Sequence, residues 1–288
     1  MSKIKIIVDS TADIPQEWME KYDVDVVSLH VNWPGGESEP DVRDPEEIRD
    51  FWKRIINARE LPKTSQPSVE QFVEAYRNAK EKGYEEIIVF CISTDMSGTY
   101  NSAMVAKEEV DIPVYVVDTK KASGVNALVA RRARELADAG KSAEEIVEFI
   151  QQKLERGEFA AIFYVSDFEF LRKGGRVSRF QSFVGGVLKI HVPIYIDDEK
   201  GMMIPFKRVR GEKKAQSAIV DKLKEKWGEG RKIRVLMMHV NNEEGAGKVL
   251  ESLQKSFDVV SHEFSMMGKV IATHVGPGTA GFGAELLE

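Results

Sequence analysis

The sequence predicts an α/β protein with two domains, an N-terminal, mostly parallel sheet flanked by helices and a C-terminal α/β (α+β) domain. Short runs rich in Val and Ile alternate with amphipathic segments through the first half. Such alternation is typical of a parallel sheet covered by helices. After residue 160 the order of strands and helices changes and tight turns appear. The length of 288 residues is enough for two domains, which we place at residues 1–160 and 161–288.

The first half is expected to contain four strands and six helices. The strands are rich in β-branched residues and bounded by polar residues or proline, at residues 3–8, 24–31, 86–91 and 114–117. The helices have apolar residues at helical spacing, at residues 15–22, 45–58, 69–82, 98–109, 124–139 and 142–156. Pro15 and Pro45 occupy the first position of the first two helices, and Asp44 is a suitable N-cap for the second.

The second half is expected to begin with a strand at residues 159–165. Further strands are predicted at 190–197, 202–207, 232–240 and 259–266, with helices at 213–227 and 243–257. Between residues 180 and 188 five apolar residues have helical spacing, although Gly185 and Gly186 weaken the helix there. The last segment contains His274 in what we predict to be a glycine-rich loop.

Composition and charge exclude several classes of protein. The formal net charge of −6 leaves no broad basic surface for nucleic acid. No apolar run approaches the roughly 18 to 20 residues that a transmembrane helix needs. The single cysteine, Cys91, lies in an apolar strand, and the histidines are too scattered to form a metal-spaced pair. We therefore expect a cytoplasmic protein without disulfide or metal, for which transient contact with a membrane surface stays open.

The segment at residues 92–103, ISTDMSGTYNSA, directly follows an apolar strand. Six of its twelve side chains carry a hydroxyl group, and the free N–H groups of a helix start favour a polar or anionic ligand group. Similar side chains follow two other predicted strands, at residues 9–13 and 118–124. Because the carboxyl ends of parallel strands meet at one edge of a sheet, we expect these segments to converge on one crevice. Helix capping and turn formation are the competing interpretation.

Several familiar catalytic motifs are missing from the sequence. There is no G-x-x-x-x-G-K-[ST] phosphate loop, no G-x-G-x-x-G after the first strand and no G-x-S-x-G nucleophile elbow. Asp9 and Asp13 superficially resemble an aspartyl-phosphate loop, but Thr11 stands where that loop would carry its second acid. We interpret both carboxylates as capping and hydrogen-bonding groups inside the crevice.

Two further loops carry candidate ligand contacts. In the loop at residues 64–68, Ser68 is a plausible helix N-cap, which leaves Thr64 and Ser65 free to face a ligand. His274 is followed by Gly276 and Gly278, which permit close approach of the backbone. An isolated histidine is more often structural, but these glycines raise the support for a ligand contact until the two interpretations are about equal.

Six short motifs follow one another along the chain, DSTADIP at 9–15, TSQPS at 64–68, SGTY at 97–100, LRKGGR at 171–176, LKI at 188–190 and GKVIATHVGPG at 268–278. Taken together and in this order, they resemble the DegV family of fatty-acid-binding proteins. The resemblance covers nearly the whole chain. It implies a long-chain fatty acid, such as palmitate, bound in a buried tunnel between the two domains, for lipid transport or fatty acid metabolism. It implies no catalysis by this chain and no cofactor besides the bound acid.

The resemblance also assigns roles to residues of this sequence. The fatty-acid carboxyl group is expected to bind Thr64, Ser93, Ser97 and His274. The supporting head-group loop is formed by Ser65, Thr94 and Gly98. Some family members, the FakB proteins, present the acid to a separate ATP-dependent fatty acid kinase for acyl-phosphate formation. Residues matched to kinase docking or phosphate handling are Arg176, Arg208 and Arg210. Thr94 stands where many relatives carry a serine, and it keeps the hydroxyl group.

The chemistry of a fatty acid agrees with these assignments. A carboxyl group removed from water costs several kcal/mol unless it is hydrogen-bonded, and hydroxyl groups with an imidazole can supply the partners. An acyl chain gains roughly 0.8 kcal/mol for each buried CH₂, so the tail should dominate the affinity. Apolar residues that could line the tunnel, or simply form the core, are Phe168, Phe170, Phe180, Phe183, Val184 and Leu188.

Two enzymatic alternatives remain at this stage. A serine hydrolase acting on a lipid-like ester would use Ser93 or Ser97 as nucleophile and His274 as base. Asp118 or Asp9 would then orient the histidine, although no elbow motif supports this arrangement. A phosphoryl-transfer enzyme is the other alternative, but its nucleotide loop is missing.

Overall fold

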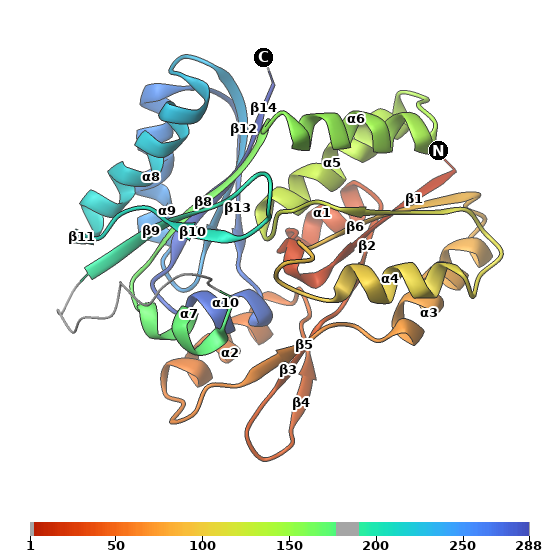
Figure 1. Ribbon diagram of the computed structural model, residues 1–288, viewed down its shortest axis with the longest axis horizontal. Helices are drawn as coiled ribbons and strands as arrows, with labels where there is room; N and C mark the ends of the chain where they lie inside the picture. Colours follow the sequence, from red (N-terminus) through yellow and green to blue (C-terminus); the bar gives the residue numbers. More distant parts are fainter. Residues whose placement is uncertain (1–2, 177–189, 288) are drawn as a thin grey trace.

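The structure is a computed structural model that describes residues 3–176 and 190–287. Within these residues the strands form two larger sheets and one small sheet (Figure 1). Helix α5 (Gly124–Asp138) packs against strands of both larger sheets. The mixed α/β class predicted from the sequence is therefore confirmed.

The first sheet has the strand order β2-β1-β6-β7, and each neighbouring pair is parallel. Its strands are β1 (Ile4–Asp9), β2 (Val24–Val27), β6 (Glu86–Cys91) and β7 (Val114–Asp118). All six residues of β1 are buried, as expected for a parallel strand covered on both faces by helices. The carboxyl ends of β1, β6 and β7 therefore lie along one edge of this sheet.

The second sheet is mixed and has the main order β10-β9-β8-β14-β12-β13, with β11 paired to β9. Its strands are β8 (Phe159–Val165), β9 (Ile190–Ile196), β10 (Met203–Pro205), β11 (Val209–Arg210), β12 (Lys232–His239), β13 (Asp258–Met266) and β14 (Ala280–Leu286). Within the described part of this second sheet, β12 and β13 form the only parallel pair, and its other strand pairs are antiparallel. An α+β arrangement of this kind matches the prediction for the second half.

Seven further helices of the described residues lie close to their predicted positions. They are α1 (Gln16–Lys21), α2 (Pro45–Ile56), α3 (Val69–Glu81), α4 (Thr99–Lys107), α6 (Ala143–Glu155), α8 (Glu212–Trp227) and α9 (Glu243–Ser256). Asp44 caps α2 as predicted, accepting hydrogen bonds from the N–H groups of Glu46 and Glu47. Helix α5 is buried on most of its surface, because it lies between the two larger sheets.

A small antiparallel sheet, at the bottom of Figure 1, was not predicted. It consists of β3 (His30–Asn32), β4 (Ser38–Pro40) and β5 (Lys63–Ser65). The expected single strand at 24–31 is wrong, since the chain leaves the first sheet after β2 and β3 pairs elsewhere. Strands of three residues are too short to show a periodic pattern, so β4 and β5 could not be predicted from the sequence.

The end of the chain differs most from the prediction. His274 lies in the last turn of helix α10 (Lys269–Val275), so its placement in a glycine-rich loop was wrong. Strand β14 follows at once and lies between β8 and β12. Helix α7 (Phe168–Gly174) was also not predicted; it lies beside α10 (Figure 1). The helical spacing predicted between residues 180 and 188 falls outside the described residues.

Strand β14 was not predicted because its sequence contains two glycines, Gly281 and Gly283. A Cβ atom at Gly281 would lie 2.4 Å from the carbonyl oxygen of Ile162, and one at Gly283 would lie 2.7 Å from the backbone of Gly124. Glycine lowers the strand signal in the sequence, yet only glycine allows α5 and β14 to approach this closely. The division at residue 160 stays a prediction, since the core is shared by both halves around α5.

Candidate ligand-binding site

A cavity of about 260 Å³ lies between the two larger sheets. One wall comes from the carboxyl-terminal edge of the first sheet, and another from the second sheet and α10. Its lining comprises Thr11, Leu29, Thr64, Ser65, Gln66, Ile92, Met96, Ser97, Gly98, Ala122, Ser123, Gly124, Ala161, Phe163, Arg176, Ile196, Met203, Met238, Met267, Val270, Ile271, His274, Val275, Phe282 and Gly283. Most of the exposed surface inside the cavity is apolar.

The predicted convergence of three strand ends is confirmed. Thr11 follows β1, Ser97 follows β6, and Ser123 follows β7; all three line the cavity. The carboxylate of Asp9 fixes two of these ends, because it accepts hydrogen bonds from the backbone N–H of Thr11 (3.0 Å) and of Ile92 (2.7 Å). Asp9 therefore acts as the capping and hydrogen-bonding group that the sequence predicted.

Thr64 and His274 meet directly in the cavity wall. The Thr64 hydroxyl oxygen lies 2.8 Å from Nε2 of His274, although the residues are 210 positions apart. Burial, together with the charge of Arg176, lowers the pKa of His274 to about 4, so its ring is neutral near pH 7. Gly174 makes room for the ring, since a Cβ atom there would lie 2.5 Å from Nδ1 of His274.

Ser97 and Gly98 also line the cavity, immediately before α4. The Ser97 hydroxyl lies 2.8 Å from the hydroxyl of Thr99 and also accepts from the Thr99 backbone N–H (3.3 Å). Gly98 lies under the side chain of Gln66, whose amide nitrogen donates to Ser102 (2.9 Å). Ser97 thus combines a place in the cavity lining with a turn-forming role.

Two of the residues predicted for the carboxyl-binding site, Ser93 and Thr94, lie outside the cavity lining among the residues that the structure describes. The Ser93 hydroxyl accepts a hydrogen bond from the backbone N–H of Asp95 (3.3 Å), and the Thr94 hydroxyl donates to Asp118 (2.7 Å). Both side chains stabilise the turn that leads from β6 to α4, and their predicted contact with a ligand stays untested.

The three predicted arginines are exposed, and they differ in their relation to the cavity. Arg176 lines it, and its guanidinium group donates to the carbonyl oxygen of Gly174 (2.8 Å). Arg210 lies on β11, and Arg208 immediately precedes that strand. The latter two are not part of the described cavity lining.

The apolar lining differs from the side chains proposed for the tunnel. Phe168 and Phe170 pack against the core from α7, and Phe170 covers Gly276. The other four candidates, Phe180, Phe183, Val184 and Leu188, lie outside the described residues. Much of the apolar lining comes instead from the second sheet, with Ala161, Phe163, Ile196, Met203, Met238 and Phe282.

Several lining residues were missed in the sequence. Gln66 stands within the TSQPS motif, so its position beside Thr64 was a usable signal. Met96, Met203, Met238 and Met267 come from four separate segments, and no spacing could have grouped them. Thioether side chains are flexible and fill irregular apolar spaces, which suits the wall of an adaptable cavity.

The geometry of a serine hydrolase is not assembled among the described residues. Ser97 contacts a threonine hydroxyl, and His274 contacts Thr64 rather than either candidate serine. Asp118 bonds to Thr94 and Asp9 bonds to backbone N–H groups, so neither carboxylate orients the imidazole. Within the described part of the chain, no cluster of three or more potential metal ligands occurs, and none of its helices has the length and apolar character that crossing a membrane requires.

Together, the fold and the site define an α/β protein of two larger sheets that enclose a mainly apolar cavity with a Thr–His pair in its wall. The chain belongs to the DegV family. The family model described as "Uncharacterised protein, DegV family" matches residues 3–286.

Relatives resemble the chain over their full length. A fatty acid-binding protein from Thermotoga maritima is 54% identical over 286 residues, covering 99% of both chains. The crystal structure of a DegV lipid-binding protein from the same organism shares 52% identity with a TM-score of 0.95, covering 100% of this chain and 99% of the other. Another T. maritima structure, described as revealing fatty acid binding function, shares 51% identity with a TM-score of 0.94, covering 100% of both chains.

Proposed function

We propose that the protein binds a long-chain fatty acid, with the acyl chain in the cavity and the carboxylate near Thr64, Ser97 and His274. The observation that carries this proposal is the 2.8 Å contact between Thr64 and His274 in the wall of a mainly apolar cavity. When Nε2 of the neutral imidazole donates to the Thr64 hydroxyl oxygen, the Thr64 hydroxyl proton is available to a carboxylate. The Ser97 hydroxyl can supply a second donor, and the neutral ring places no second positive charge beside Arg176. The fatty-acid- and lipid-binding relatives support the same function.

The energetics favour a ligand with a long tail and a single polar end. A carboxylate taken out of water needs hydrogen-bond partners, since its burial otherwise costs several kcal/mol. The tail contributes roughly 0.8 kcal/mol for each CH₂ that leaves water. Hydrogen bonds at the polar end then fix the orientation of the ligand, and the apolar lining supplies most of the affinity.

Affinity is expected to rise about fourfold for each added CH₂ from decanoate to palmitate, as 0.8 kcal/mol per buried group requires. The rise should stop when the chain fills the cavity. Displacement of a fluorescent fatty acid from delipidated protein measures the series. Native protein is also expected to release a long-chain fatty acid into the mass spectrometer after denaturation. Protein that is purified empty and binds no acid of the series would contradict the proposed function.

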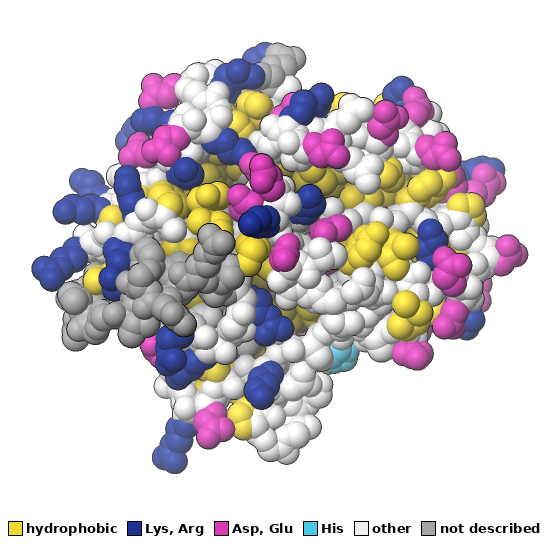
Figure 2. Space-filling view, viewed as in Figure 1, with side chains coloured by type: hydrophobic (Ala, Val, Ile, Leu, Met, Phe, Trp, Pro, Cys, Tyr) yellow, Lys and Arg dark blue, Asp and Glu magenta, His cyan; other side chains and the backbone are white. Residues whose placement is uncertain are grey.

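We further propose that the protein is a non-catalytic cytoplasmic carrier, used in lipid transport or fatty acid metabolism, that presents its acid to an ATP-dependent fatty acid kinase. Lys and Arg side chains gather on the left of the molecule in Figure 2, where α7, β11 and α8 lie in Figure 1. Exposed basic residues of these elements and their flanks include Arg172, Lys173, Arg176, Lys207, Arg208, Arg210, Lys213 and Lys214. Such a surface attracts an acidic partner or the phosphates of its nucleotide.

The double substitution Arg208→Gln and Arg210→Gln is expected to raise the kinase KM for the loaded protein about tenfold, because rim charges mainly act on encounter with a partner. Palmitate affinity should not change, since neither side chain lines the cavity. The assay traps acyl phosphate as hydroxamate in the presence of a bacterial fatty acid kinase. A matched control is Lys80→Gln with Lys82→Gln, which removes two exposed charges at the end of α3. An equal KM for both double variants would remove the docking proposal.

A further inference from the structure

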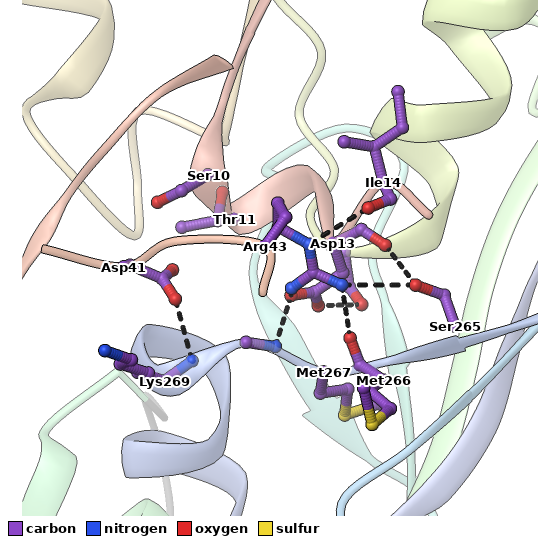
Figure 3. A network of polar contacts seen from close by, with 12 residues as sticks. Ser10, Thr11, Asp13, Ile14, Asp41, Arg43, Ser265, Met266, Met267 and Lys269 are labelled. Carbon is purple, nitrogen blue, oxygen red and sulfur yellow. Dashed lines mark hydrogen bonds and ion pairs between the residues drawn. The ribbon is translucent and has the colours of Figure 1, made fainter. Parts of the chain in front are cut away.

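Asp13, Asp41 and Arg43 form a buried polar network between the loops of the first half and the start of α10 (Figure 3). Asp13 and Asp41 are fully buried, and Arg43 is 8% exposed. None of the three belongs to the described lining of the cavity. Buried charges are costly unless they are paired and hydrogen-bonded. The partners of these three side chains therefore indicate what the network stabilises.

The two carboxylates hold the first turn of α10. The helix begins after Gly268, which has no side chain to cap it. Asp13 Oδ1 accepts from the Gly268 backbone N–H (2.6 Å), and Asp41 Oδ1 accepts from the Lys269 backbone N–H (2.8 Å). Side chains from two distant segments therefore perform the capping that a helix normally obtains from its own N-cap residue.

Arg43 fixes the strand that leads into this helix. Its guanidinium group donates to the carbonyl oxygen of Met266 (2.6 Å) and to the hydroxyl of Ser265 (3.2 Å) at the end of β13. The same group donates to Ile14 (2.9 Å) and lies 3.3 Å from Asp13 Oδ1. Arg43 thereby joins the turn after β1 to the segment immediately before α10, as Figure 3 shows.

The network also reaches the cavity through the residues that it fixes. The last turn of α10 carries His274, which contacts Thr64. Asp13 Oδ2 accepts from the Ser123 hydroxyl (2.6 Å), and Ser123 lines the cavity with a positive φ of 56°. One set of buried side chains outside the described cavity lining therefore fixes two parts of that lining, His274 on α10 and Ser123.

We propose that Asp13, Asp41 and Arg43 are positioning residues that set the selectivity of the cavity for a carboxylate over an uncharged polar end. By fixing α10, they hold His274 against Thr64, so that the Thr64 hydroxyl can donate to a carboxylate. By binding the Ser123 hydroxyl, they also fix the neighbouring part of the cavity lining. This inference rests on the proposed fatty acid binding. A merely structural network would affect acids and alcohols of the same chain length equally, because both bury the same tail.

The test compares palmitate with 1-hexadecanol by displacement of a fluorescent probe. Asp41→Ala is expected to lower palmitate affinity about tenfold, the loss that follows when hydrogen bonds to a charged group are weakened. Its hexadecanol affinity should stay within about twofold of the wild type. Asp41→Asn keeps an acceptor for the Lys269 N–H and should restore most of the selectivity. Thr64→Val, which removes a direct head-group contact, gives the benchmark for selectivity loss.

A matched control removes a cap from a helix that does not line the cavity. Ser142 caps α6 through the Glu145 N–H (3.2 Å), and Ser142→Ala should leave the palmitate-to-hexadecanol ratio unchanged. If Asp41→Ala weakens both ligands equally, or neither, the positioning role is overturned. If the Asp41→Ala protein does not fold, Arg43→Lys is tested in its place. It should likewise lower palmitate affinity but not hexadecanol affinity, since one ammonium group cannot reach all the partners of the guanidinium group. Wild-type protein that binds neither ligand would instead overturn the proposed function itself.

Discussion

Replacing Ala161 by phenylalanine is expected to lower palmitate affinity by more than about three orders of magnitude. Ala161 on β8 lies opposite Gly283 on β14, and both residues line the cavity. The added ring occupies space for about six carbon atoms, and excluding as many CH₂ groups from the cavity removes about 5 kcal/mol of binding free energy. Probe displacement with palmitate and decanoate measures the effect, which should be much smaller for the shorter acid.

Two controls separate a blocked cavity from a damaged fold. Overpacking costs typically 1–3 kcal/mol of stability, so thermal unfolding of Ala161→Phe must show a cooperative transition before its binding is interpreted. Val105 on α4 is 53% exposed, and Val105→Phe adds an aromatic ring outside the cavity. Palmitate affinity should be unchanged in that variant. Unchanged palmitate affinity in a folded Ala161→Phe protein would show that the acyl chain lies elsewhere.

The parts of the site that could be predicted depend on local chemistry. Polar residues at the ends of parallel strands must meet at one edge of the sheet, and Thr11, Ser97 and Ser123 do meet there. The pairing of Thr64 with His274 could not be reached in this way, since 210 positions separate them and no spacing relates them. Only the family resemblance placed both residues at the same polar group.

Other features could not be predicted from the sequence because they depend on tertiary contacts rather than on the local pattern of residues. The glycines of β14 reduce its strand signal in the sequence. Glycine is required there because α5 and β8 approach β14 closely. Ser93 and Ser97 are indistinguishable in sequence, yet the hydroxyl of Ser93 bonds within the turn while Ser97 lines the cavity. Asp13 was expected to bond within the crevice, but its bond to the N–H of Gly268 across 255 positions could not be foreseen.

Arg43→Met is expected to lower the free energy of unfolding by about 3–5 kcal/mol, the usual result of removing one member of a buried ion pair. Asp13 would lose its counter-charge at 3.3 Å, and the carbonyl oxygens of Ile14 and Met266 would lose their donors. Urea unfolding followed by circular dichroism measures the change. Arg49→Met, an exposed arginine on α2, should remain within about 0.5 kcal/mol of the wild type.

The destabilisation should also depend on pH. Burial raises the pKa of Asp13 to about 7 even though the charge of Arg43 lowers it, so the variant's Asp13 pKa must be higher still. A carboxyl group whose pKa is raised in the folded state stabilises the folded protein at low pH. This stabilisation is lost as the pH rises to the folded-state pKa, which is higher in the variant than in the wild type. The difference between wild type and Arg43→Met should therefore grow from about pH 6 to about pH 8. In the double variant with Asp13→Asn this growth should vanish; a pH-independent difference in the single variant would show that Asp13 is not the group left unpaired.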